Sequence, residues 1–177
     1  MKNQIKIIAS AVMIGLSSVQ TGNAADYTLI PPEAFGSQEH ITLARTVNTF
    51  GVPIIDGSKS GFKECKPSNG AVTFGFYSAS LNGMVLCTAN GSFELMKQTF
   101  VHEIMHMVQD CRAGLGNSSL RDKDGNLTKL QYSSLSNSHK HNIHNLYSGH
   151  AAIYEIEARE LEDSPRIAWK YLVKYCK

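Results

Sequence analysis

The stretch that decides the fold reads Phe100-Val101-His102-Glu103-Ile104-Met105-His106-Met107. Its apolar residues predict a helix, and side chains four residues apart in a helix lie one above the other on the same face. His102 and His106 therefore present two imidazoles side by side, close enough to bind one Zn2+ ion between them. Glu103 lies next to His102 and can act as a general base toward water on such an ion. The stretch thus predicts a helical metal site.

Signals at both ends support this helix. Asn90 or Ser92 can cap its start, Glu94 lies near its positive end, and Gly114 stops it after about Cys111. The alternative interpretation is a buried structural helix in which one histidine serves as a cap and the other is the partner of a carboxylate.

The first 25 residues have the composition of a bacterial-type signal peptide. Lysines at positions 2 and 6 precede an apolar run and a small-residue exit, so we expect cleavage near Ala24 or Ala25. The run is short for a spanning helix, although a retained membrane anchor is the alternative. We therefore expect a secreted or periplasmic protein in which residues 26–177 form a single domain.

Removing this leader takes away two lysines and no acids, which leaves 15 basic and 15 acidic residues. A net charge of zero favours neither nucleic acid nor an anionic membrane as a partner. We expect no membrane insertion after cleavage, and the expected partner is a peptide or a protein.

All four cysteines lie after the leader, and an even number in an exported chain predicts two disulfides. Four cysteines allow three pairings, of which we favour Cys65 with Cys87 and Cys111 with Cys176. A cysteine-ligated metal site is the competing interpretation, but the chain has no Cys-x-x-Cys pair.

Before the motif, the sequence predicts a helix and two strands. Ser37 can cap a helix that ends near Phe50. Residues 71–77 and 84–87 have strand composition and are joined through Asn82-Gly83, which favours an antiparallel hairpin. We expect the second strand to be the sheet edge along which a peptide binds, and an ordinary core strand is the alternative.

After the motif, residues 115–149 form a polar insertion that we expect over the active face. In it, residues 122–126 can be read as a calcium loop, but a glycine-containing turn is the favoured interpretation. His139, His141 and His144 can in principle bind metal, although we favour exposed positions for them. Helical periodicity returns at about residue 149 and continues to Tyr175, with a break at Pro165.

A catalytic zinc site usually has three protein ligands and a water. Residue 112 is Arg where a metzincin would have its third His, so that class is excluded. The C-terminal helix offers Glu155 and Glu157 instead.

With these residues the chain resembles the gluzincin metallopeptidases, and among them the compact minigluzincin-like proteins. In that family the His-Glu-x-x-His helix is followed by a helix with a zinc-binding Glu and a small residue three positions later, which here reads Glu155-Ile156-Glu157-Ala158. The resemblance covers roughly residues 70–165 and implies that Glu155 is the third ligand. Glu157 stays open as a rival, because helix phase alone does not separate the two. Arg159 departs from the pattern, since the family often has an Asp or Asn there that orients the first histidine.

The resemblance implies an α+β, zincin-like fold, with a small antiparallel sheet packed on the active-site helix and on a C-terminal Glu-bearing helix. It implies one Zn2+ per chain, held by His102, His106 and Glu155, and hydrolysis of peptide bonds with Glu103 as general base.

Other functions and further residues stay open. The oxyanion donor is among His144, Tyr147 and His150. A metal amidase acting on cell-wall peptide differs only in substrate. The alternative from another class is a non-catalytic exported protein of zincin fold that binds or inhibits a target protein.

Overall fold

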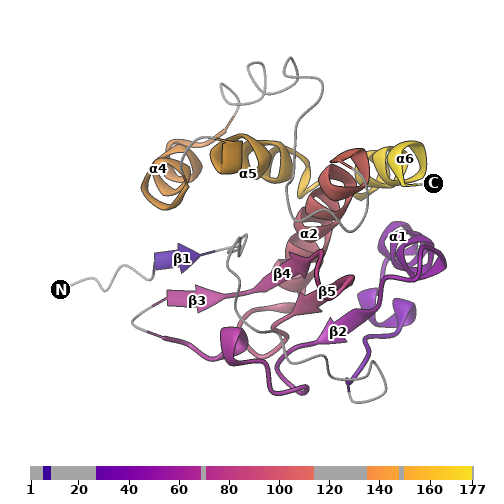
Figure 1. Ribbon diagram of the computed structural model, residues 1–177. Coiled ribbons are helices and arrows are strands. Elements are labelled where there is room, and N and C mark those ends of the chain that lie inside the picture. Colours follow the sequence, from indigo (N-terminus) through magenta and orange to yellow (C-terminus); the bar gives the residue numbers. More distant parts are fainter. Residues whose placement is uncertain (1–5, 9–26, 69–70, 114–134, 148–149, 177) are drawn as a thin grey trace.

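Helix α2 (Phe93–Ala113), 21 residues long, runs through the middle of the molecule, with a small sheet on one side and further helices beside it (Figure 1). This arrangement agrees with the α+β class predicted from the sequence. The computed structural model describes residues 6–8, 27–68, 71–113, 135–147 and 150–176.

The sheet has three strands in the order β2 (Ile54–Asp56), β5 (Gly83–Leu86) and β4 (Gly75–Ser78). β4 and β5 form the predicted antiparallel pair, but β2 runs parallel to β5, so the sheet is mixed and the prediction of an antiparallel sheet is wrong. The long connection between β2 and β5 lets the chain return to run in the same direction. The predicted edge strand is also wrong, because β5 lies in the centre and β4 forms the edge.

The stretch predicted as one strand over residues 71–77 forms two, β3 (Ala71–Thr73) and β4. β3 pairs in parallel with β1 (Lys6–Ile8), which lies within the predicted signal peptide. Cleavage at the predicted position would remove β1 and leave β3 without this partner strand.

Helix α1 (Gln38–Thr49) begins where the sequence predicts. The Ser37 hydroxyl accepts a hydrogen bond from the backbone N–H of His40, which confirms Ser37 as the N-cap. Two short 3-10 helices, η2 (Pro32–Phe35) and η3 (Lys63–Cys65), lie in segments where no helix was predicted.

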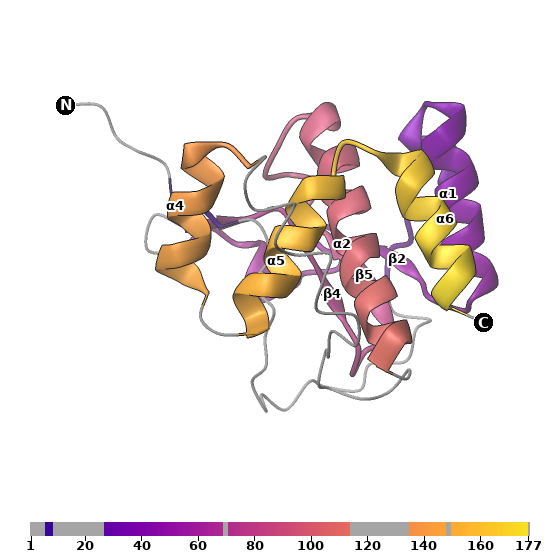
Figure 2. The same cartoon turned by 90° about the horizontal axis from the view of Figure 1, so that it is seen from above.

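The C-terminal part contains α5 (His150–Leu161) and α6 (Pro165–Tyr175), and the predicted break at Pro165 is confirmed. Helix α4 (Asn137–Leu146) lies inside the segment that we expected to be an irregular polar insertion. Seen from above, the helices follow one another in the order α4, α5, α2, α6 and α1, and neighbours in this order are in contact (Figure 2). Helix α2 therefore has α5 on one flank and α6 on the other.

Every residue from 101 to 110 of α2 is buried. A helix that is buried all round is a central core element rather than a surface one. Its apolar side chains belong to one cluster with residues of α1, α6 and β5, and they include Phe100, Ile104, Met105 and Val108. The ring of Phe100 stacks on that of Phe35, with 4.2 Å between centroids. The same cluster includes Ala158 and Leu161 of α5, so the core packs α2 against both of its neighbouring helices.

Both favoured disulfides are confirmed: Cys65 is bonded to Cys87 and Cys111 to Cys176. The first links η3 to the end of β5, and the second links the last turn of α2 to the residue after α6. Disulfides fit an extracellular protein. No helix in the described ranges is long and apolar enough to cross a bilayer.

The Cys111–Cys176 bridge should be a major contributor to stability. It closes a loop of 65 residues, for which loop entropy predicts about 4 kcal/mol. Replacing both cysteines by serine should lower the free energy of unfolding, measured by urea denaturation, by about that amount. The matched control replaces Cys65 and Cys87, which close a loop of 22 residues and should cost about 3 kcal/mol. An unchanged midpoint in the first variant would contradict the expectation.

Candidate metal centre

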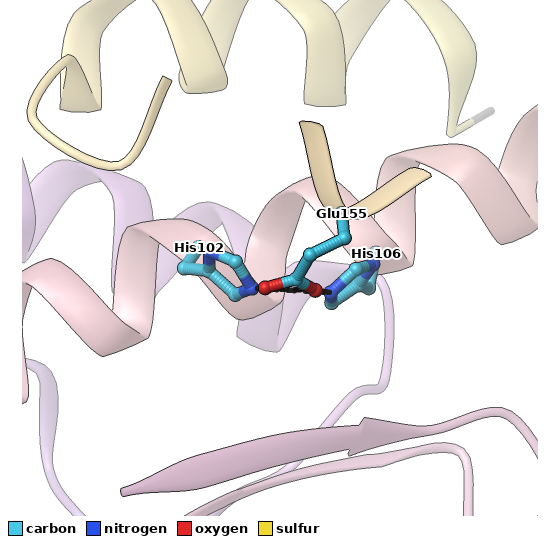
Figure 3. Close-up of side chains that lie close together, drawn as sticks. All are labelled: His102, His106 and Glu155. Atoms are coloured by element: carbon cyan, nitrogen blue, oxygen red, sulfur yellow. Dashed lines mark hydrogen bonds and ion pairs between the residues drawn. The ribbon is translucent and has the colours of Figure 1, made fainter. Parts of the chain in front are cut away.

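Helices α2 and α5 bring together three of the residues singled out in the sequence, His102, His106 and Glu155 (Figure 3). The two imidazoles lie one turn apart on α2, and the carboxylate of Glu155 reaches between them from α5. The two Nε2 atoms are 3.2 Å apart, and each is 3.5 Å from Oε2 of Glu155. All three side chains are buried, at most 2% exposed.

These distances fit a metal ion. Ligand atoms about 2.0–2.1 Å from a tetrahedral zinc lie about 3.3 Å from one another, close to the separations of the two nitrogens and the oxygen. Oε2 of Glu155 has no hydrogen-bond partner among the described residues, although it is fully buried. A buried charged oxygen without a partner costs more than the roughly 1–3 kcal/mol of a neutral group. A divalent cation would satisfy this oxygen and both nitrogens together.

The outer nitrogen of His102 faces Glu162, with 3.2 Å between Nδ1 and Oε2. A carboxylate only accepts, so Nδ1 carries the proton and Nε2 points toward Glu155. Burial opposes the charged imidazolium, but the neighbouring carboxylates of Glu155 and Glu162 raise the pKa of His102 to about 9. A metal ion entering the group would therefore displace a proton from Nε2.

The outer nitrogen of His106 has a hydrogen-bond partner on its own helix. Its Nδ1 lies 2.9 Å from Oε1 of Gln109, whose amide nitrogen donates to Glu157 Oε2 and to the backbone carbonyl of Tyr154, both at 2.9 Å. Arg112 donates to the other oxygen of Glu157 at 2.8 Å. The structure thus brings Glu155 to the histidines, whereas Glu157 contacts Gln109 and Arg112 and is linked to His106 only through Gln109.

Arg159 joins two carboxylates, one on α5 and one on the residue just after it. Its Nε donates to Oε1 of Glu155 at 3.0 Å, and one terminal nitrogen donates to Oε2 of Glu162 at 3.1 Å. Burial disfavours a carboxylate at Glu155, but His102, His106 and Arg159 lower its pKa well below the usual range. Glu155 is therefore ionised, as a metal ligand must be.

Glu103 lies on the face of α2 that meets the edge strand β4. The backbone N–H of Tyr77 donates to Oε2 of Glu103 at 2.8 Å, and the Tyr77 hydroxyl donates to Asp110 at 2.9 Å. Gly75 lets the strand approach this closely, because a Cβ there would lie 2.7 Å from Cγ2 of Thr99. One residue of β4 thus contacts α2 at two carboxylates seven positions apart.

Tyr147, which follows α4, is the predicted oxyanion donor that the structure places at the site. Burial raises the pKa of its phenol, as do the carboxylate of Glu155 and the hydrogen bond to it. The hydroxyl consequently stays protonated and can donate. The side chains of the other two candidates, His144 and His150, lie outside the described part of the structure.

The remaining predicted metal sites do not join this group. Among the described residues, one group of side chains could hold a metal ion, and it contains neither His139 nor His141. His141 is exposed, with Nε2 2.9 Å from the amide of Asn145. The side chain of His144 and the calcium-like residues 122–126 lie outside the described residues.

Gln109 and Glu162 were not predicted as parts of the site, and Arg159 was named only as a departure from the family pattern. The spacing of Gln109 held a signal, because it follows His106 by three residues and so lies on the same face of α2. Glu162 lies just after the end of α5, seven residues beyond Glu155.

The metal group lies within a segment shared with other proteins. Residues 58–177 match a family described as a domain of unknown function, DUF8637, and this segment includes both histidines and Glu155. No curated protein and no solved structure matches the chain. The matched segment covers well over half of the sequence, and the chain therefore belongs to the DUF8637 family.

Proposed function

We propose that this protein is an exported zinc-dependent metallopeptidase. The observation that carries the proposal is the buried triangle of two Nε2 atoms and one carboxylate oxygen, with separations of 3.2 and 3.5 Å. Nitrogen and oxygen donors in this number and geometry are those of a catalytic zinc site with a fourth position for water. The two disulfides support export.

In this mechanism His102, His106 and Glu155 hold the metal, and Zn2+ when bound supplies a Lewis acid that lowers the pKa of water and polarises the scissile carbonyl. Glu103 accepts the proton of the attacking water and passes it to the leaving amine. The hydrogen bond from Tyr77 fixes one oxygen of this carboxylate.

Tyr147 is the proposed donor to the developing oxyanion. Its phenol stays protonated in the buried site, and its single O–H would turn from Glu155 to donate to a substrate oxygen beside the metal. The edge of β4 is the proposed position of the peptide, because extended peptides bind by adding a strand to a sheet edge. Tyr77 on that edge contacts Glu103, so a peptide along it would pass close to the metal group.

One observation favours the second candidate, a non-catalytic exported binding or inhibitor protein. His102, Glu103, His106 and Glu155 are all at most 2% exposed. A site that stays closed can keep a metal without admitting a substrate. An amidase acting on cell-wall peptide would use the same residues and would need the same opening.

We expect one zinc per chain in protein purified under metal-replete conditions, measured by elemental analysis. Glu155→Gln should lose most of this zinc, because a neutral amide oxygen replaces the charged ligand. Glu157→Gln should bind zinc much more tightly than Glu155→Gln, because Glu157 contacts Gln109 and Arg112 instead of the histidines. The reverse order of affinities would assign the third ligand to Glu157.

Glu103→Gln should keep zinc but lose peptide cleavage. General bases contribute about 10²–10⁴-fold to rate, so kcat should fall by that factor in an assay with a fluorogenic peptide library. Asp163→Asn is the matched control, since it removes one negative charge from an exposed position. Retained cleavage in Glu103→Gln would refute its role. Zinc-loaded wild-type protein that cleaves no peptide would favour the non-catalytic candidate.

Tyr147→Phe should lower kcat by about 10²–10³-fold, as expected when one oxyanion donor is removed, and zinc content should stay at one per chain. Tyr171→Phe on α6 is the matched control, because that half-buried ring stacks on Tyr175, away from the metal group. Equal kcat values for the two variants would show that Tyr147 is not the donor.

A further inference from the structure

Three charged residues at the C-terminal end of α5 and just after it lie close to α2. Glu155 and Arg159 are four residues apart on α5, and Glu162 is the first residue after the helix ends at Leu161. Arg159 bridges the two carboxylates, at 3.0 Å from Glu155 and 3.1 Å from Glu162. Glu162 also reaches His102 at 3.2 Å. The contacts form a closed ring that runs from His102 through Glu162, Arg159 and Glu155 back to His102.

Glu162 controls the orientation of the His102 ring. Free rotation of an imidazole would move Nε2 away from the position that it shares with Nε2 of His106. The contact of Nδ1 with Glu162 sets that rotation and also keeps the proton on Nδ1, so that the lone pair lies on Nε2 when the ring is neutral. Arg159 cannot do this itself, because a guanidinium only donates hydrogen bonds.

Arg159 controls which oxygen of Glu155 faces the histidines. Its Nε holds Oε1, so Oε2 alone is turned toward the two Nε2 atoms and remains without a hydrogen-bond partner among the described residues. Glu155 is thereby set up to bind a metal through one oxygen. Arg159 also lies between two buried carboxylates, Glu155 and Glu162, which would otherwise repel each other.

Charge balance points to the same arrangement. A metal ion binds neutral imidazoles, and with both histidines neutral the carboxylates of Glu103, Glu155 and Glu162 and the guanidinium of Arg159 sum to two negative charges. Buried charge of this size needs compensation. One divalent cation between His102 and Glu155 would supply it.

We propose that Glu162 and Arg159 are positioning residues that preset the metal group, Glu162 through Nδ1 of His102 and Arg159 through Oε1 of Glu155. This inference rests on the proposed metal site but not on peptidase activity. Outer partners of metal ligands typically change metal affinity by about 10–100-fold. The pair should therefore affect how tightly the metal is held, whatever reaction the site performs.

The test is the zinc affinity of the full-length purified protein, measured by competition with a chromophoric chelator. Glu162→Ala should weaken zinc binding by about 10–100-fold and Arg159→Met by about 10-fold. Glu162→Gln should weaken it less than Glu162→Ala, since the amide oxygen can still accept from Nδ1. If Glu162→Ala does not fold, the isosteric Glu162→Gln variant still tests the proposal. The double variant should lose less than the product of the single losses, because the two residues act as a pair.

Matched controls separate positioning from charge and stability. Asp163→Asn and Arg166→Met remove one charge of each sign from exposed positions and should change affinity less than twofold. The visible spectrum of the cobalt-substituted protein is a second readout, since a change in ligand geometry at Glu162→Ala should alter it. Thermal unfolding of the metal-free variants shows any loss of stability separately.

Affinities of the Glu162 and Arg159 variants within twofold of these controls would overturn the positioning role and leave the peptidase proposal standing. The expected losses in a wild-type background that cleaves no peptide would support positioning and refute the peptidase. A wild-type protein that binds no zinc would overturn both.

Discussion

The structure depends on one constraint: residues 101–110 of α2 are all buried, and yet this stretch carries charged and polar side chains. Each buried polar group on it needs a partner, because water cannot supply one. Two elements on different faces of α2 provide such partners. Helix α5 brings the carboxylate of Glu155 to His102 and His106, and strand β4 brings a backbone N–H to Glu103. The packing of α5 and β4 against α2 is therefore fixed by polar contacts as much as by apolar area.

Because two elements meet α2 at neighbouring residues, the proposed metal ligands and the proposed general base are positioned independently. His102 is oriented by a side chain at the end of α5, while Glu103, one residue later, is oriented by a backbone N–H of the sheet. A helix turns by about 100° per residue, so adjacent side chains necessarily face different neighbours. The Cys111–Cys176 bridge and the apolar cluster with α1 and α6 hold α2 from a third side. Small shifts of α5 would thus alter metal binding without moving the base.

The features that depend on neighbouring residues could be predicted from the sequence. Those that depend on contacts between distant segments could not. The cap at Ser37, the break at Pro165 and the helical phase of the histidines depend on a few adjacent residues, and the structure agrees with each. Strand order and direction depend on contacts between distant segments, so the parallel pairing of β2 with β5 and the edge position of β4 were missed. Helix α4 was missed because its sequence is polar and depends on packing against α5. Glu162 was missed because only the packed pair of helices shows that it reaches His102.

The position of Glu103 depends on a backbone group and on an absent side chain. The N–H that holds its carboxylate belongs to the main chain of Tyr77, so a substitution of that ring leaves the donor in place. The close approach of β4 instead requires Gly75, where a Cβ would lie 2.7 Å from Thr99 and 2.9 Å from the carbonyl of Val85. Neither contact can be relieved without moving the strand away from α2 or from β5, since one neighbour is backbone and the other is a β-branched side chain in a helix. A single methyl group at position 75 would therefore displace β4 and lengthen the hydrogen bond that orients the proposed general base. It would affect the proposed reaction without touching the site itself.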